Sequence, residues 1–124
     1  MNAPERKSSF VLDRGQRKIT YEADTRIENG GNFVINKEDH TIGNLLVSDL
    51  VKNEHIKFAA YQKPHALLTH INLKVATDGT KTPLKVMIES VKNISELLDM
   101  VDETFGKELK QYQDNHQPMD SLYD

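Results

Sequence analysis

Two spacings of hydrophobic residues recur along the chain and divide it into extended and helical segments. An alternation of apolar and polar residues, or a short apolar run bounded by turn residues, predicts a β-strand, because successive side chains of a strand point to opposite faces. Apolar residues three and four positions apart predict a helix with one buried face. The segments that fit a strand are 18–24, 33–38, 55–63 and 70–79.

The clearest of these strands covers residues 70–79. Ile71, Leu73 and Val75 alternate with polar residues, so their three side chains are predicted to face a common core. A turn is predicted before the second strand, at residues 28–32, where two adjacent glycines allow positive φ angles at little cost.

A first helix is predicted between about residue 41 and Asn53. Asp39 or Thr41 can cap its start by accepting a hydrogen bond from a free backbone N–H of the first turn. Gly43 removes a side chain early in the helix, which allows close packing either on its own sheet or on a neighbouring helix. Two lines of apolar residues give the helix more apolar surface than one contact requires: Ile42, Leu45, Leu46 and Leu50, flanked by Val47 and Val51.

A long second helix is predicted from Pro83 to about residue 113. Thr82 suits the N-cap, and a proline at the first helical position already has the required φ angle. Apolar residues then recur at alternating intervals of three and four, which is the heptad pattern of helices that pack along one another. This heptad seam consists of Leu84, Met87, Val91, Ile94, Leu98, Val101 and Phe105.

The order of these elements is strand, strand, helix, strand, strand, long helix. It predicts a two-layer α+β fold, an antiparallel four-stranded sheet with two helices on one face. A chain of 124 residues supports one core. We expect an N-terminal arm at residues 1–16, a single α+β dimerisation domain at 17–114 and a flexible acidic tail at 115–124.

The predicted long helix exceeds the predicted sheet in length. At 1.5 Å per residue the helix spans roughly 45 Å, whereas a six-residue strand spans only roughly 20 Å. The seam nevertheless stays apolar at Leu98, Val101 and Phe105. We therefore expect the far half of the helix to pack on another chain and to serve dimerisation. The alternative is that the chain bends back and its tail covers the helix end.

The charge of the chain does not favour direct binding of nucleic acid. The formal net charge is −3 and the isoelectric point is about 5.9, whereas proteins that grip phosphates carry a basic patch. Acidic residues are interleaved with the basic ones, which is typical of a solvated surface. No apolar run approaches the roughly 20 residues that cross a bilayer, so we expect no membrane partner and a cytosolic or nuclear protein.

Candidate chemistry is sparse. The absence of cysteine excludes disulfides, thiolate catalysis and cysteine-ligated zinc. His40 beside Asp39 could form a catalytic pair, but no motif frames a nucleophile, so a helix cap is favoured. The five histidines lack metal-binding spacing. We expect no catalytic residue, no metal ligand and no cofactor.

Four stretches of the chain resemble one known family. They are NAPE at 2–5, KEDHTIGNLL at 37–46, FAAYQKPH at 58–65 and INLKVATDGT at 71–80, the last before a long helix. Together they resemble the eleventh subunits of eukaryotic RNA polymerase II, which are related to the archaeal polymerase L subunit and to the N-terminal domain of the bacterial α subunit. The residues that match the family motif are Asp39, His40, Thr41, Gly43, Asn44, Phe58, Tyr61, Pro64 and His65.

The resemblance implies a non-catalytic assembly subunit of a nuclear polymerase. In the family this fold pairs with a larger α-like subunit, the third subunit of RNA polymerase II, and the heterodimer serves as a platform for the two catalytic subunits. The helix after the motif and the long C-terminal helix would form the interface. The partner-interface residues expected on this basis are Ile42, Gly43, Leu45, Leu46, Val47, Met87, Val91, Ile94, Leu98, Val101 and Phe105.

Three other functions remain open at this point. The first is the α-like small subunit of another nuclear polymerase. The second is a regulatory α+β domain that forms a homodimer and binds a small ligand, which would require a pocket and a self-complementary interface. The third is a small enzyme.

Overall fold

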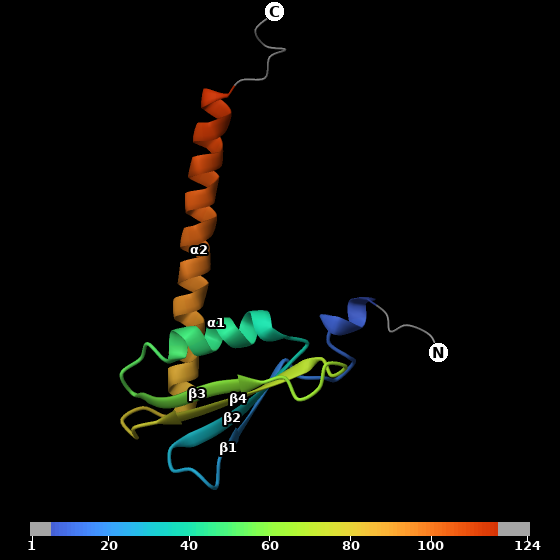
Figure 1. Cartoon of the computed structure of the whole chain (residues 1–124), viewed down its shortest axis with the longest axis vertical. Coiled ribbons are helices and arrows are strands. Elements are labelled where there is room, and N and C mark those ends of the chain that lie inside the picture. Colours follow the sequence, from blue (N-terminus) through green and yellow to red (C-terminus); the bar gives the residue numbers. More distant parts are fainter. Residues whose placement is uncertain (1–5, 117–124) are drawn as a thin grey trace, which may run out of the picture.

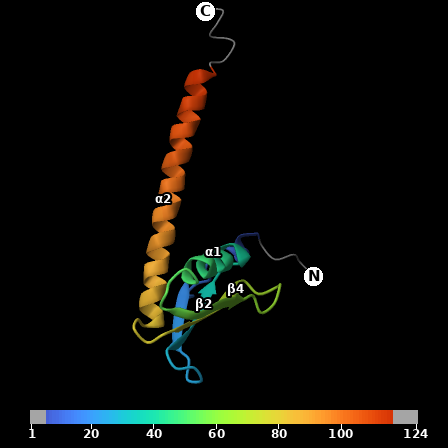
Figure 2. The ribbon, with the colours of Figure 1, turned by 60° about the vertical axis from the view of Figure 1, so that its left-hand side comes forward.

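A computed structural model describes residues 6–116 of the chain (Figure 1). An open four-stranded antiparallel sheet has the strand order β1-β2-β4-β3. One helix lies across the sheet, and the other begins against the two central strands and extends far beyond the sheet (Figures 1 and 2). The elements are η1, a 3-10 turn at Arg6–Ser9, then β1 Ile19–Ala23, β2 Gly30–Asn36, α1 His40–Leu50, β3 Ile56–Gln62, β4 His70–Thr77 and α2 Pro83–Asn115. This confirms the α+β fold and the predicted order of elements.

The core forms between the helices and one face of the sheet. Strand β4 is a central strand that lies between β2 and β3. The helices cover its apolar face. Ile71, Leu73 and Val75 are fully buried, as their alternation predicts, while Asn72 and Lys74 are exposed on the other face. The helices and β2 complete the core with Phe33, Ile35, Leu46, Leu50, Val86, Met87 and Ile94.

The predicted turn at residues 28–32 is wrong in its second half. Gly30 and Gly31 belong to β2, are buried, and pair with Ala76 and Val75 of β4. A Cβ atom at Gly31 would lie 2.6 Å from Cε2 of Tyr21, so this glycine serves close packing of an aromatic ring. The positive φ angle that the turn requires falls on Asn29 instead (58°).

The helix starts follow the predicted capping. Asp39, and not Thr41, caps α1, and Thr82 caps α2 by accepting a hydrogen bond from the Lys85 N–H over 3.2 Å. Helix α1 ends at Leu50, three residues early, because the Asn53 N–H bonds the Leu50 carbonyl in a turn. Helix α2 runs two residues past its predicted end.

A buried lysine fastens the N-terminal arm to the domain. The Lys37 ammonium donates to the Ser8 carbonyl over 2.7 Å and to the Thr69 hydroxyl over 3.2 Å, and it lies 3.6 Å from an Asp13 carboxylate oxygen. These partners satisfy a cation that would be costly to bury alone. The described part of the predicted arm, residues 6–16, is therefore fastened to the sheet domain. Most of the predicted tail, residues 117–124, lies outside the described residues.

Two adjacent aliphatic residues, one in the core and one exposed, should differ strongly in their contribution to stability. Leu50→Ala should lower the free energy of unfolding by about 2–5 kcal/mol, because Leu50 is 0% exposed and its loss leaves a cavity. Val51→Ala is the control, since Val51 is 58% exposed, and it should change stability by less than about 0.5 kcal/mol. Urea denaturation measures both, and equal effects would contradict the described core.

Candidate partner-binding surface

The acidic residue of the His-Thr-x-Gly-Asn motif organises the start of α1. An Asp39 carboxylate oxygen accepts a hydrogen bond from the Thr41 N–H over 2.9 Å, and Asp39 has the extended backbone of an N-cap. This backbone hydrogen bond, followed by one from the Thr41 side chain, lowers the pKa of Asp39 below its ordinary value of 3.8. Asp39 therefore has a structural role at the helix start.

The two halves of the motif meet where α1 crosses β3. A Cβ atom at Gly43 would lie 2.5 Å from Cδ2 and 2.8 Å from Cγ of Tyr61, so the absent side chain makes room for that ring. The Tyr61 hydroxyl lies 3.0 Å from Nδ1 of His40, and the two rings meet edge to face. Of the two packing partners left open for Gly43, the structure supplies one from its own sheet.

The remaining motif residues are placed around this contact. Thr41 and Asn44 are exposed on the first turn of α1, and Phe58 is half exposed on the sheet face opposite Tyr61. Pro64 and His65 lie in the exposed loop after β3, where Nδ1 of His65 accepts a hydrogen bond from the Leu67 N–H over 3.1 Å.

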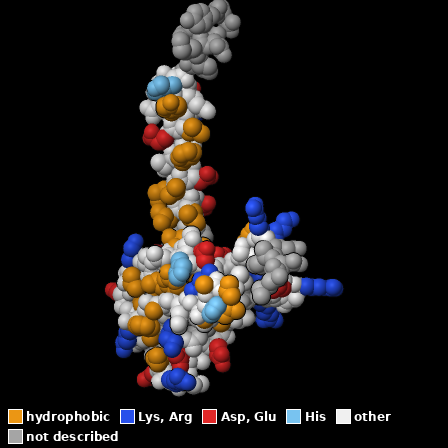
Figure 3. Space-filling model, turned by 45° about the vertical axis from the view of Figure 1, so that its right-hand side comes forward, with side chains coloured by type: hydrophobic (Ala, Val, Ile, Leu, Met, Phe, Trp, Pro, Cys, Tyr) orange, Lys and Arg blue, Asp and Glu red, His pale blue; other side chains and the backbone are white. Residues whose placement is uncertain are grey.

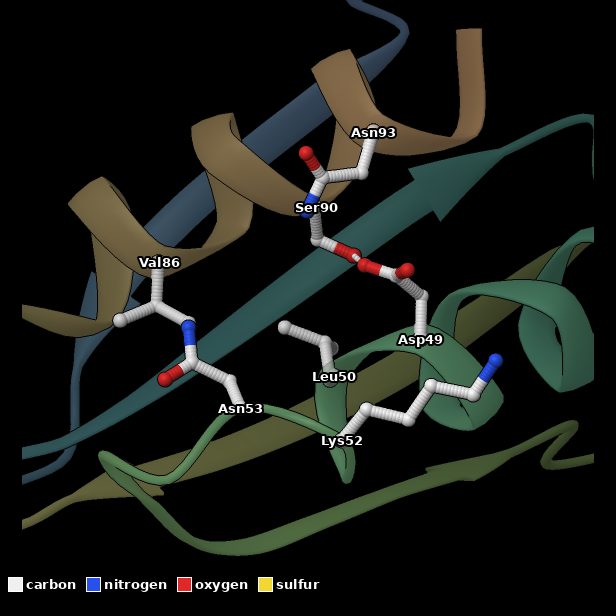
Figure 4. A pocket seen from close by; sticks show the side chains of 7 residues that line it. All are labelled: Asp49, Leu50, Lys52, Asn53, Val86, Ser90 and Asn93. Atoms are coloured by element: carbon white, nitrogen blue, oxygen red, sulfur yellow. Dashed lines mark hydrogen bonds between the residues drawn. The ribbon is translucent and has the colours of Figure 1, made fainter. Parts of the chain in front are cut away.

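The two helices are tied together at the end of α1. The Ser90 hydroxyl donates to an Asp49 carboxylate oxygen over 2.7 Å (Figure 4). A shallow hollow of about 310 Å³ opens beside this bond, lined also by Asn53 and Asn93. Ser90 is buried and its bond joins α2 to the last turn of α1, so the pair is a structural link between the helices.

The far half of α2 has no cover in the described structure. Every residue from 95 to 115 of the helix is exposed, although the apolar seam continues along it (Figure 3). Leu98 and Val101 are each 56% exposed and Phe105 is 65% exposed. Contiguous apolar surface of this kind marks a site of protein–protein contact. Leu97, Leu109 and Tyr112 widen the stripe.

The predicted interface residues divide into three groups in the structure. Gly43, Leu46, Met87 and Ile94 are buried in the chain's own core. Three residues of α1 are partly buried and pack against that core: Ile42, Leu45 and Val47. Four residues of α2 remain exposed: Val91, Leu98, Val101 and Phe105. The last group is the surface available to a partner, and we call it the α2 stripe.

Sequence reasoning missed two features near this surface. Met100 is 59% exposed but lies off the heptad seam, so periodicity gave no signal for it. Helix α2 also starts on the chain's own core and leaves it only after Ile94, a boundary that depends on tertiary packing.

Other candidate chemistry resolves into structural contacts. His55 Nδ1 lies 3.0 Å from an Asp78 carboxylate oxygen, and this hydrogen bond, with one from the Thr80 N–H, lowers the pKa of Asp78. The contact joins the start of β3 to the end of β4. Among residues 6–116, no three histidine or acidic side chains gather as a metal site, and no helix is long and apolar enough to cross a membrane.

Comparison with known proteins gives one consistent family. Residues 31–104 match the model of the RNA polymerase Rpb3/Rpb11 dimerisation domain. A DNA-directed RNA polymerase II subunit rpb11 of Dictyostelium discoideum is 37% identical over 110 residues, covering 89% of this chain and 92% of that protein. The RPB11 subunit of Schizosaccharomyces pombe is 34% identical over 108 residues, covering 87% of each.

A solved structure shares the fold. The crystal structure of the DNA-directed RNA polymerase subunit L from Thermoplasma acidophilum superposes with a TM-score of 0.64. It covers 82% of this chain and 100% of its own, at 19% sequence identity. At that identity the likeness shows the fold.

The contact between Gly43 and Tyr61 predicts a reversal of sign. Gly43→Ala should destabilise the chain, because displacing the ring costs about 1–3 kcal/mol, more than the roughly 1 kcal/mol that alanine gains in a helix. In a Tyr61→Ala chain the same substitution should stabilise by about 1 kcal/mol. Urea denaturation of the four chains tests this, and additive effects would show that the ring is not the neighbour that matters.

The Asp39 cap predicts a pH dependence. Because its pKa is lower in the folded chain than in the unfolded chain, the cap stabilises the fold above its ordinary pKa, and this contribution is lost as the pH falls through the folded value. Asp39→Asn keeps an acceptor but cannot titrate. The wild type should therefore lose more stability than Asp39→Asn between about pH 5 and about pH 2. Parallel urea midpoints across this range would disprove the role of the carboxylate.

Proposed function

Because the chain belongs to the family of RNA polymerase Rpb3/Rpb11 dimerisation domains, we propose that it is a non-catalytic assembly subunit of DNA-directed RNA polymerase II. It acts in the nucleus, in transcription of mRNA genes. It pairs with an Rpb3-like third subunit, and the heterodimer is the platform on which the two catalytic subunits assemble. The relatives named above are both polymerase II subunits, which favours this enzyme over other nuclear polymerases.

The observation that carries this proposal is the exposed α2 stripe. Burying an exposed Leu, Val or Phe side chain fully stabilises by roughly 1.5–3 kcal/mol. Covering Leu98, Val101 and Phe105 with a partner's apolar face would supply several kilocalories per mole. Helix α1 packs against the base of α2, so it lies near the start of the α2 stripe (Figure 2).

A non-catalytic role is consistent with the described side chains. Ser90 bonds a carboxylate without a histidine, His40 bonds Tyr61, and His55 bonds Asp78. Each of these groups has a structural partner among the described residues, which is consistent with structural roles. On this proposal the chain contributes a binding surface to the polymerase, and other subunits carry out the catalysis.

A single charge in the α2 stripe should abolish pairing. Leu98→Asp would bury an unpaired carboxylate in the interface, which costs several kilocalories per mole, and a loss of about 4 kcal/mol lowers affinity roughly a thousandfold. Lys92→Asp is the control, because Lys92 is exposed on the solvent side of the same helix and exposed charges contribute about 0–1 kcal/mol. Calorimetry with a purified Rpb3-like subunit measures both affinities.

The thermal midpoints of the isolated variants complete this test. Leu98 makes no core contact within the described chain, so Leu98→Asp should leave the midpoint nearly unchanged. A large drop in the midpoint with intact affinity would mean that the stripe packs on its own chain. Equal and small losses of affinity for the two variants would remove the stripe from the interface.

A further inference from the structure

The N-terminal segment concentrates basic charge in a chain that is acidic overall. Residues 6–18 hold five basic residues and one acidic residue, whereas the whole chain has a formal net charge of −3. Figure 3 shows Lys and Arg side chains projecting around this part of the molecule. We call residues 6–18 the basic segment.

Most of these cations have no acidic partner within the described chain. Lys18 pairs with Glu38 over 2.7 Å, and the acidic residue of the segment, Asp13, lies 3.6 Å from Lys37. The other four basic residues are exposed and form no ion pair among residues 6–116: Arg6, Lys7, Arg14 and Arg17. Their charges are therefore available to an anionic group of another molecule.

Exposed apolar side chains accompany this charge. Phe10 is 64% exposed, and it lines a hollow of about 310 Å³ together with Lys63 and Thr69. The basic segment thus lies beside the loop between β3 and β4, residues 63–69. Further exposed apolar residues of the segment and the loop are Val11, Leu12, Leu67 and Leu68. Exposed apolar groups rimmed by polar ones mark sites of protein–protein contact.

The backbone that carries these side chains is fixed near both ends of the segment. The Lys37 ammonium donates to the Ser8 carbonyl and to the Thr69 hydroxyl, which holds the segment and the loop together. Nδ2 of Asn36 donates to the Arg17 carbonyl over 2.7 Å. A surface that is ordered before binding loses less conformational entropy when a partner covers it.

This surface is separate from the α2 stripe. The basic segment lies at the end of the sheet opposite the base of α2, and the far half of α2 points away from the sheet (Figures 1 and 2). A molecule bound at the basic segment therefore leaves the stripe free for its own partner.

We propose that the basic segment and the loop 63–69 form a second protein-binding surface, whose partner is a protein segment that carries both carboxylates and apolar side chains. The carboxylates pair with the unpaired cations, because the planar guanidinium of arginine matches the geometry of a carboxylate. The apolar side chains of the partner cover Phe10 and the leucines of the loop. The inference goes beyond the proposed function, since it assigns a partner to a surface outside the α2 stripe.

The side chains of this surface favour a protein over other anionic partners. Its exposed apolar residues are aliphatic apart from Phe10, whereas proteins that hold single-stranded nucleic acid offer several aromatic rings for stacking. Within residues 6–18 the helical structure is a four-residue 3-10 turn. A membrane surface is bound by a much longer amphipathic helix.

A fluorescein-labelled synthetic peptide, in which glutamate is interspersed with leucine and phenylalanine, tests the proposal by fluorescence anisotropy with the full chain. Arg14→Glu combined with Arg17→Glu should weaken binding about tenfold or more at about 0.1 M salt. The control is Lys52→Glu combined with Lys57→Glu, which makes the same change in net charge at exposed positions outside the basic segment. It should bind the peptide as tightly as the wild type does.

A second pair of variants tests the apolar part of the surface. Phe10→Ser combined with Leu67→Ser should also weaken binding about tenfold, with an unchanged thermal midpoint because both side chains are exposed. Leu98→Asp, in the α2 stripe, should leave the affinity for the peptide unchanged. An equal loss of affinity in Leu98→Asp would place the peptide on the stripe and overturn the proposal.

Two further probes identify the class of partner. A peptide with serine in place of leucine and phenylalanine should bind the wild type about tenfold more weakly. Equal binding of the two peptides, or equal binding by the wild type and the Arg14→Glu, Arg17→Glu chain, would contradict the proposal. A single-stranded oligonucleotide or a phosphatidylserine vesicle that binds the basic segment more tightly than the peptide would also overturn it, in favour of nucleic acid or lipid.

Discussion

Helix α2 is longer than the sheet on which it begins, and this difference in length leaves its far half outside the core. On the inner side of its first turns, Val86, Met87 and Ile94 are buried by the sheet and by α1, and the same heptad spacing then continues through Leu98, Val101 and Phe105 without any cover from the described chain. Helices that lack tertiary packing are only marginally stable in water. We therefore propose that a second chain completes the far half of α2.

Two residues of the family motif, together with one bond between the helices, fix how the helices leave the sheet. Asp39 caps α1, Gly43 lets the helix settle on the Tyr61 ring, and Ser90 ties α2 to Asp49 of α1. Each contact lies within the chain. These residues thus position the helix that carries the α2 stripe, the surface that we propose for the partner.

Sequence patterns predicted the features that follow from local periodicity. The alternation of Ile71, Leu73 and Val75 gave the central strand, and Thr82-Pro83 gave the start of α2. Features that depend on residues far apart in the sequence could not be predicted. Gly31 sits under Tyr21 and not in a turn, and nothing local to Lys37 indicates that its ammonium is buried between the arm and the loop before β4. The same limit applied to the interface, where Met87 and Ile94 share the heptad with Leu98 yet belong to the core.

Hydrogen–deuterium exchange of α2, in the isolated chain and after mixing with an Rpb3-like polymerase subunit, tests the central claim most directly. Amides of residues 86–94 should be protected in both states, because the core holds that part of the helix. Amides of residues 95–115 should exchange quickly in the isolated chain and become protected in the complex. Equal exchange of residues 95–115 in the two states, with the complex formed, would contradict the conclusion that a partner covers the far half of α2.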